Sequence, residues 1–176
     1  MRDDGTRIVQ IYCGAGKGKT TAAVGQAIRA AGNGYLVSFV QFLKAGAGSG
    51  EIPILANTPG IEFHAFGRGL FLSRGAISEK DVLIARSGME SIRVVASGRT
   101  ADMLLLDEVG AALELGLVDD DELLDVIALG EGWLDMVLTG RVFPESLMEA
   151  ADLVTRMDEI RHHYKNGVGA RRGIEF

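Results

Sequence analysis

One short segment near the N-terminus constrains the fold more than any other part of this 176-residue chain. It reads Gly14-Ala15-Gly16-Lys17-Gly18-Lys19-Thr20, and Thr21 follows it. An apolar run at residues 7–13 predicts a strand before it, and residues 20–31 predict a helix after it. Glycines at such a junction let successive backbone N–H groups turn inward, and the helix N-terminus adds unpaired donors. The segment is therefore predicted to cradle phosphate.

A glycine-rich turn between a strand and a helix is the context that a P-loop requires. Lys19 is placed to neutralise phosphate oxygens, and the hydroxyl of Thr20 is placed to ligate Mg²⁺. The usual pattern begins with glycine five residues before Gly18, and this chain has Cys13 there. We expect Cys13 to be a buried packing residue. The alternative is an incidental turn rich in glycine and lysine, which would not need the flanking strand and helix.

A second candidate element is the run Met103-Leu104-Leu105-Leu106-Asp107-Glu108. Four apolar residues followed by two acidic ones predict a buried strand that delivers carboxylates to its end. Many strands end on acidic residues, so the indication gains its weight from the P-loop in the same short chain. We expect Thr20, Asp107 and Glu108 to hold Mg²⁺, directly or through water. The expected catalytic residues are Lys19, Thr20 and Glu108.

Short apolar runs rich in β-formers alternate with segments of helical period along the chain. This alternation is typical of a parallel sheet covered by helices on both faces. Strands are expected at residues 7–13, 35–42, 61–66, 102–107, 134–139 and 153–157. Helices are expected at residues 20–31, 78–97, 119–129 and 145–151, while segments 44–50 and 67–75 have no assignment. Residues 1–176 are predicted to form a single α/β domain of the RecA-like P-loop NTPase class, with a mostly parallel six-stranded sheet.

The composition argues against several other classes of protein. A net charge of −6 disfavours general nucleic-acid binding, which needs clustered cations. A single cysteine excludes an internal disulfide and a multi-cysteine metal site. No apolar run approaches the roughly 18–20 residues that span a bilayer, and the N-terminus has no hydrophobic signal region. We expect a cytoplasmic protein without nucleic-acid or membrane partners.

Further short stretches carry a resemblance to a known family. They lie at residues 14–21, 39–44 with 50–51, 67–69, 104–108, 138–141, 151–154, 167–168 and 173–176. The combination of a P-loop with Val-Gln-Phe-Leu-Lys, Leu-Thr-Gly-Arg and a Gly-Ile-Glu-Phe ending resembles the P-loop ATP:corrinoid adenosyltransferases, also called cob(I)alamin adenosyltransferases. The stretches occur in family order over essentially the whole chain.

The resemblance implies an unusual use of a P-loop. In this family the Co(I) of a corrinoid attacks the 5′-carbon of ATP, and triphosphate leaves; the reaction serves cobalamin synthesis or salvage. Co(I) is a strong nucleophile that needs no general base, so the protein positions the reactants and stabilises the leaving group. A phosphate cradle, Lys19 and Mg²⁺ suit a departing triphosphate. The resemblance also implies a homodimer and a flavoprotein reductant.

The expected contacts to ATP and corrinoid extend beyond the cradle. They are Gly14, Ala15, Gly16, Lys17, Gly18, Lys19, Thr20 and Thr21, together with Gln41, Lys44, Arg68, Phe71 and Arg141. Family members commonly have Asn where Ala15 stands. Their loop after Gly-Arg-Gly usually continues Phe-Thr-Trp, where this chain has Leu70-Phe71-Leu72. Phe71 either presses its ring against the corrin or is an apolar loop tip packed in the core.

Two other functions stay open at this point. A small-molecule kinase would need a base for the substrate hydroxyl near the γ-phosphate and would yield ADP. A carrier would bind ATP and corrinoid without turnover, and the altered loop at residues 70–72 keeps that reading open. The preferred corrinoid, the electron donor and the roles of His162 and His163 do not follow from the sequence.

Overall fold

The structure is a computed structural model that describes residues 6–46, 48–70 and 72–175. Its centre is a six-stranded sheet in the order β3-β2-β4-β5-β1-β6. The strands are β1 (Val9–Cys13), β2 (Val37–Phe42), β3 (Ile61–Phe66), β4 (Met103–Asp107), β5 (Asp135–Thr139) and β6 (Leu153–Arg156). Every neighbouring pair is parallel. The six expected strands and the α/β class are confirmed, and the sheet, expected to be mostly parallel, is entirely so.

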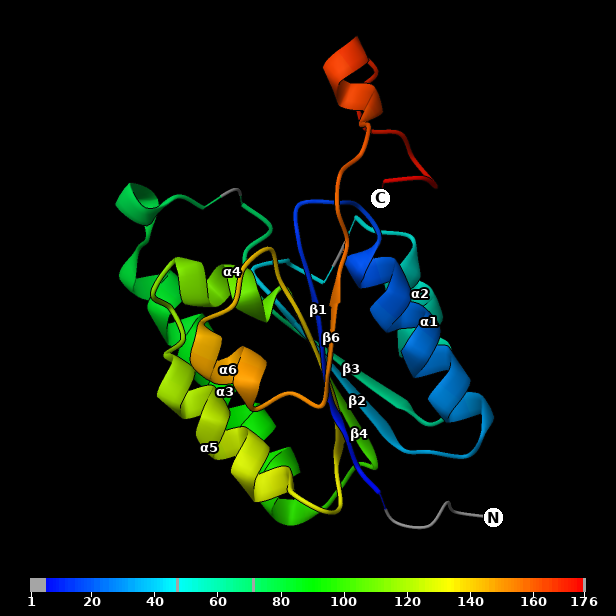
Figure 1. Cartoon of the computed structure of the whole chain (residues 1–176), viewed down its shortest axis with the longest axis vertical. Coiled ribbons are helices and arrows are strands. Elements are labelled where there is room, and N and C mark those ends of the chain that lie inside the picture. The colour runs from blue at the N-terminus through cyan, green and yellow to red at the C-terminus, as the bar shows by residue number, and fades with distance from the viewer. Residues whose placement is uncertain (1–5, 47, 71, 176) are drawn as a thin grey trace.

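Helices cover both faces of the sheet, as Figure 1 shows. One face carries α1 (Lys19–Gly32) and α2 (Glu51–Asn57), and the other carries α3 (Glu79–Gly98), α4 (Val109–Glu114), α5 (Asp120–Gly130) and α6 (Glu145–Glu149). Two 3₁₀ turns are η1 (Arg74–Ala76) and η2 (His163–Asn166). The four helices expected from the sequence are confirmed with small shifts at their ends. The short helices α2 and α4 had no assignment from the sequence.

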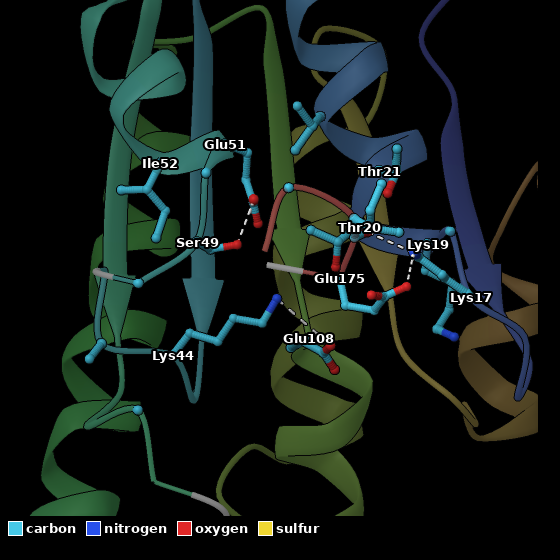
Figure 2. Close-up of a pocket in the computed structure, with 18 residues that line it drawn as sticks. Lys17, Lys19, Thr20, Thr21, Lys44, Ser49, Glu51, Ile52, Glu108 and Glu175 are labelled. Carbon is cyan, nitrogen blue, oxygen red and sulfur yellow. Dashed lines mark hydrogen bonds and ion pairs between the residues drawn. The ribbon is translucent and has the colours of Figure 1, made fainter. Parts of the chain in front are cut away.

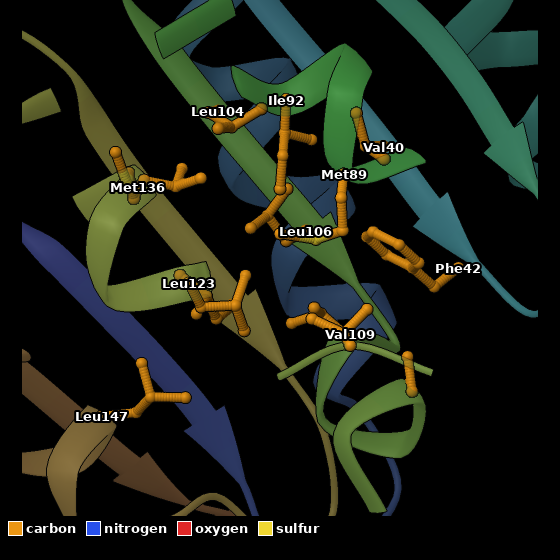
Figure 3. Close-up of a cluster of buried hydrophobic side chains, with 14 of the residues drawn as sticks. Val40, Phe42, Met89, Ile92, Leu104, Leu106, Val109, Leu123, Met136 and Leu147 are labelled. Carbon is orange, nitrogen blue, oxygen red and sulfur yellow. The ribbon is translucent and has the colours of Figure 1, made fainter. Parts of the chain in front are cut away.

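Two hydrophobic cores lie on opposite sides of the sheet. Successive side chains of a strand point to opposite faces, so one strand serves both cores. On β4, Leu104 and Leu106 pack on the side of α3 to α6, while Met103 and Leu105 pack on the side of α1 and α2. Figure 3 shows the first of these cores, to which α3 contributes Met89. Burial on both faces explains why the strands read as continuous apolar runs.

Local signals fix several element ends. Ser78 caps α3 through a capping box, in which its hydroxyl accepts the N–H of Asp81 and the Asp81 carboxylate accepts the N–H of Ser78. Ser78, the first residue of the helix expected at 78–97, is therefore the N-cap of α3. Pro144 stands immediately before α6, where its missing N–H costs no hydrogen bond. Cys13 is 7 % exposed at the end of β1, which confirms it as a packing residue.

The parallel sheet brings the carboxyl ends of all its strands to one edge, where ligand sites form in such folds. The P-loop follows β1 at this edge, and Asp107 and Glu108 stand at the end of β4. The chain after β6 leaves from the same edge, extends away from the sheet, and turns back toward the start of α1 (Figure 1). Within the described ranges, no helix has both the length and the apolar character that crossing a membrane requires.

Candidate active site

The P-loop is held against the ends of β5 and β6. Gly14 and Gly18 have φ angles of 101° and 117°, in the region that favours glycine. The N–H of Gly14 donates to the carbonyl of Arg141 at 2.9 Å, and the N–H of Gly16 donates to the carbonyl of Met157 at 2.7 Å. A Cβ atom at Gly14 or at Gly16 would overlap the carbonyl of Met157. The glycines are therefore required by the close approach of neighbouring backbone as well as by the turn.

Lys19 lies across the loop that precedes it. Its Nζ donates to the carbonyls of Gly14 and Gly16, both at 2.7 Å. Burial lowers the pKa of Lys19, and the carboxylate of Glu108 is the strongest influence in the opposite direction. A partly desolvated cation interacts more strongly with an anion that enters the same space. Lys19 thus occupies the position that the sequence predicts for a phosphate-neutralising residue.

Asp107 is the centre of a buried hydrogen-bond network and is itself 0 % exposed. Its Oδ1 accepts hydrogen bonds from the hydroxyls of Thr20 at 2.9 Å and Thr139 at 2.8 Å. Its Oδ2 accepts from Gln41 Nε2 at 2.9 Å and from Lys44 Nζ at 3.3 Å. Because β2 and β5 flank β4, Gln41 and Thr139 reach Asp107 from its two sides. The structure thus brings together four of the residues that the sequence predicts for the site: Thr20, Gln41, Lys44 and Asp107.

Thr139 is a member of this network that sequence analysis did not identify. Besides donating to Asp107, its hydroxyl accepts the backbone N–H of Glu108 at 2.9 Å. A single side chain thus orients both acidic residues. Thr139 belongs to the Leu-Thr-Gly-Arg stretch at residues 138–141, so the signal was present but was assigned to Arg141 alone.

Glu108 turns the chain from β4 into α4. Its φ angle is 60°, a left-handed conformation that non-glycine residues seldom adopt and that often marks a functional position. Burial raises the pKa of Glu108, and the neighbouring charge of Asp107 raises it further. Lys44 lies 4.0 Å from the carboxylate and acts in the opposite direction. The left-handed backbone and the burial of Glu108 therefore both cost free energy of folding, which other interactions of the fold must offset.

The residues at the cradle fit Mg²⁺. Thr20, Asp107 and Glu108 offer oxygen atoms, the ligands that this ion prefers, and the amide oxygen of Gln41 is buried nearby without a hydrogen bond in the described structure. Among the residues described, no group of three His, Cys, Asp or Glu side chains could hold an ion alone. One or two carboxylates suffice when phosphate oxygens complete the coordination. The donor set is that of a metal that binds together with a nucleotide.

A cavity of about 730 Å³ opens over the cradle, and Figure 2 shows the side chains around it. We call it the nucleotide cavity. Of the residues selected from the sequence, its walls contain Lys17, Gly18, Lys19, Thr20, Thr21, Lys44 and Glu108. The loop after β2 and the start of α2 add Ser49, Glu51 and Ile52, which the sequence analysis did not select. The volume suits a small-molecule ligand with a polar end at the P-loop.

A second cavity of about 770 Å³ adjoins the first and shares Lys44, Gly69 and Glu108 with it. Its other walls are mostly apolar and consist of Leu43, Leu70, Leu72, Ala111 and Leu115, with Glu114 and Arg141 as charged members. We call it the apolar cavity. Arg141 therefore lies at the second cavity, while its backbone carbonyl supports the P-loop. The two cavities together offer a charged compartment beside an apolar one.

Some expected contacts lie elsewhere. Arg68 donates from Nε and Nη2 to the two carboxylate oxygens of Asp81, at 2.7 and 2.8 Å, and lines neither cavity. Ala15 is exposed and also lines neither cavity. Phe71 lies outside the described residues. Direct substrate contacts by these three residues stay predictions.

Comparisons with known proteins point to one family. The family model described as ATP:corrinoid adenosyltransferase BtuR/CobO/CobP matches residues 5–176. A corrinoid adenosyltransferase of Pseudomonas aeruginosa is 31% identical over 170 residues, which cover 96% of this chain and 83% of that protein. One from Sinorhizobium is 32% identical over 178 residues, with 99% and 83% covered. One from Escherichia coli (strain K12) is 31% identical over 169 residues, with 96% and 85% covered.

One solved structure is similar to this chain in fold alone. The KaiC-like protein of the hyperthermophilic archaeon Pyrococcus horikoshii OT3 aligns with a TM-score of 0.53 and 19% sequence identity. The alignment covers 85% of this chain and 71% of that one. At this identity the likeness speaks for the α/β P-loop architecture only.

Proposed function

We infer that this chain, which belongs to the ATP:corrinoid adenosyltransferase family, transfers the 5′-deoxyadenosyl group of ATP to the Co(I) of a corrinoid. The reaction belongs to the synthesis or salvage of cobalamin. The observation that carries this inference is the direct junction of the nucleotide cavity with the apolar cavity, through Lys44, Gly69 and Glu108. Transfer between a charged nucleotide and a large, flat macrocycle needs two such compartments in contact.

The proposed chemistry asks little acid or base work of the protein. The lone pair of Co(I) forms the cobalt–carbon bond, the C5′–O bond breaks, and its electron pair leaves with the triphosphate. No proton is transferred in this step, so the protein contributes positioning and charge stabilisation. Lys19 and the glycine-rich backbone supply fixed positive charge and N–H donors for the leaving group. With Co(I) as the nucleophile and the protein as the source of positive charge, the reaction needs no catalytic acid–base pair.

We propose that Thr20, Asp107 and Glu108 hold Mg²⁺ when the nucleotide is bound. The ion would neutralise part of the charge that develops on the departing triphosphate. Gln41 and Thr139 keep the carboxylate of Asp107 in one orientation through hydrogen bonds of 2.9 and 2.8 Å. Lys44 reaches both acidic residues and stands at the boundary between the cavities. Its charge is thus available to both substrates.

We assign the apolar cavity to the corrin. Leu43, Leu70 and Leu72 offer apolar surface to a flat macrocycle, and burial of such surface is favourable by about 25 cal/mol per Å². Phe71, between two of these leucines in the sequence, is the proposed aromatic contact to the corrin. We further propose that a flavoprotein supplies electrons for Co(I), and that the enzyme is a cytoplasmic homodimer.

One anaerobic experiment tests the function. The protein is mixed with ATP, Mg²⁺ and a chemically reduced corrinoid, and the spectrum of the cobalt–carbon product is followed while phosphate products are separated by ion chromatography. We expect adenosylated corrinoid and triphosphate in equal amounts. ADP formed in step with product would favour a kinase instead, and binding of both substrates without product would favour a carrier.

A further inference from the structure

The end of the C-terminal segment, defined here as residues 163–175, lies in the nucleotide cavity. After β6 the chain extends beyond the sheet, forms η2 and turns back (Figure 1). Gly173, Ile174 and Glu175 thereby line the cavity next to the P-loop, and Figure 2 shows Glu175 among the P-loop side chains. The functional assignments above give this segment no role.

Lys17 of the P-loop holds the segment in place. Its Nζ donates to the carbonyl of Ile174 at 2.6 Å and to Oε1 of Glu175 at 2.9 Å. Ion pairs between fully exposed side chains contribute little to stability. The Glu175 side chain, however, is only 15% exposed. The contact therefore anchors the segment against the P-loop.

Arg171 and His163 of the segment also lie beside Glu175. The backbone N–H of Arg171 donates to Oε2 at 2.7 Å, and the Arg171 side chain approaches the same oxygen at 3.5 Å. His163 Nε2 lies 3.5 Å from Oε1. The hydrogen bond from Lys17 is the largest influence that lowers the pKa of Glu175 to about 2. Its charge is thus present at neutral pH and is matched by Lys17 and Arg171, so the cluster does not oppose an anionic ligand.

We propose that Glu175 is a positioning residue that acts through Lys17 and closes the C-terminal segment over the triphosphate end of the nucleotide. An ammonium group has three N–H donors. Among the described residues, Ile174 and Glu175 use two of those on Lys17, so the third is available to a phosphate oxygen. Nucleotide binding and closure of the segment then favour each other, because both depend on the same orientation of Lys17. This inference rests on the proposed function, in that the nucleotide is ATP.

A pair of matched variants tests the proposal. Glu175→Gln removes the charge and keeps the size of the side chain. Glu90→Gln makes the same change on an exposed carboxylate of α3 that lines neither cavity. ATP affinity is measured by calorimetry, and closure is measured by hydrogen–deuterium exchange of residues 163–175 with and without ATP.

We expect Glu175→Gln to raise the Kd and the KM for ATP about tenfold, with little change in kcat at saturating ATP. The protection of the segment that ATP induces should be lost in this variant. Glu90→Gln should match the wild type, and Glu175→Asp should recover part of the affinity. The recovery separates a role of the charge from a general disturbance of the chain end.

Two results would overturn the proposal. Tighter ATP binding by Glu175→Gln would mean that Glu175 competes with phosphate for Lys17. Unchanged affinity and unchanged protection would mean that the segment does not close on the nucleotide. Both measurements use ATP without corrinoid. If the wild-type protein bound ATP but transferred no adenosyl group, the proposed function would be wrong. The comparison of Glu175→Gln with the wild type would still test whether the segment closes on ATP.

Discussion

The two adjoining cavities are built from different parts of the fold. The nucleotide cavity is lined by the P-loop after β1, by the loop after β2 and by Glu108 after β4. The neighbouring carboxylate of Asp107 is 0 % exposed and bonded on both oxygens. The apolar cavity is walled by α4 and by loops, and Leu70 is 55 % exposed. Groups fixed to strand ends keep their geometry, whereas loops adjust to a ligand. We therefore expect the first cavity to set the rate of transfer and the second to set corrinoid affinity.

The largest expected effect lies in the nucleotide cavity. Lys19→Ala removes the cation that lies across the cradle, and loss of one preorganised partner of a developing charge costs about 2.7–4 kcal/mol, or roughly 10²–10³ in kcat. The fold should persist, because within the described part of the chain the Lys19 ammonium bonds to two carbonyls of the adjoining loop, those of Gly14 and Gly16. Steady-state kinetics measure kcat, and circular dichroism measures whether the fold persists. Lys80→Ala, on the exposed start of α3, is the control, and near-normal turnover of folded Lys19→Ala would remove the cradle from the mechanism.

The next effect tests whether strand-end hydrogen bonds set the rate. Thr139→Val keeps the shape of a side chain that is 1 % exposed but leaves the N–H of Glu108 without its partner. Such a loss costs about 1–3 kcal/mol of stability. We expect a fall in kcat of about tenfold, with the KM for corrinoid unchanged, because Asp107 and Glu108 lose their common anchor.

Urea unfolding and kinetics separate the two consequences of that substitution. Thr155→Val, at an exposed position of β6, makes the same chemical change away from the site and should alter neither quantity. If Thr139→Val lowered stability and left kcat intact, Thr139 would be a purely structural residue.

A smaller and more selective effect is expected from the wall of the apolar cavity. The two hydrogen bonds from Arg68 to Asp81 tie the loop after β3 to the start of α3, and this loop supplies Gly69, Leu70 and Leu72 to the cavity. Arg68→Ala should raise the KM for corrinoid about fivefold and leave the KM for ATP unchanged. An equal rise in both would instead favour the direct contact with the substrates that the sequence predicts for Arg68.

The nucleotide cavity was the more predictable of the two because its signals are contiguous. Seven adjoining residues encode the cradle, and a run of apolar residues ending in Asp107 and Glu108 encodes the strand that faces it. Each motif carries its own structural context, a strand before it and a helix or turn after it. The order of strands in the sheet was not needed to recognise either one.

The remaining parts of the site depend on contacts between distant segments. Thr139 reaches Asp107 only because β5 lies beside β4, and Glu175 reaches Lys17 only because the chain end turns back over the P-loop. The pairing of Asp81 with Arg68 likewise depends on the geometry of the loop after β3. Helices α2 and α4 have 7 and 6 residues, too few to show a helical period.

The smallest expected effect concerns Glu108, which borders both cavities. Burial and the charge of Asp107 raise its pKa in the folded protein, so its ionised form is less favourable there than in the unfolded chain. The stability associated with neutral Glu108 is present below its unfolded pKa, about 4.3, and is lost as the pH rises through the folded value. Glutamine does not ionise, so Glu108→Gln does not lose this stability as the pH rises.

The variant should therefore unfold at a slightly higher temperature than the wild type at neutral pH, and the difference should vanish below about pH 4. Adenosyl transfer should fall at the same time, since Gln is a poorer ligand for Mg²⁺ than a carboxylate. Thermal unfolding across pH 4–8 and kinetics at neutral pH measure the two changes, with Glu149→Gln on the exposed side of α6 as the control. A variant that is less stable at neutral pH would show that Glu108 is retained for the fold. If Glu108→Gln gains stability and loses activity, the charge of Glu108 serves the reaction at the junction of the two cavities and does not stabilise the fold.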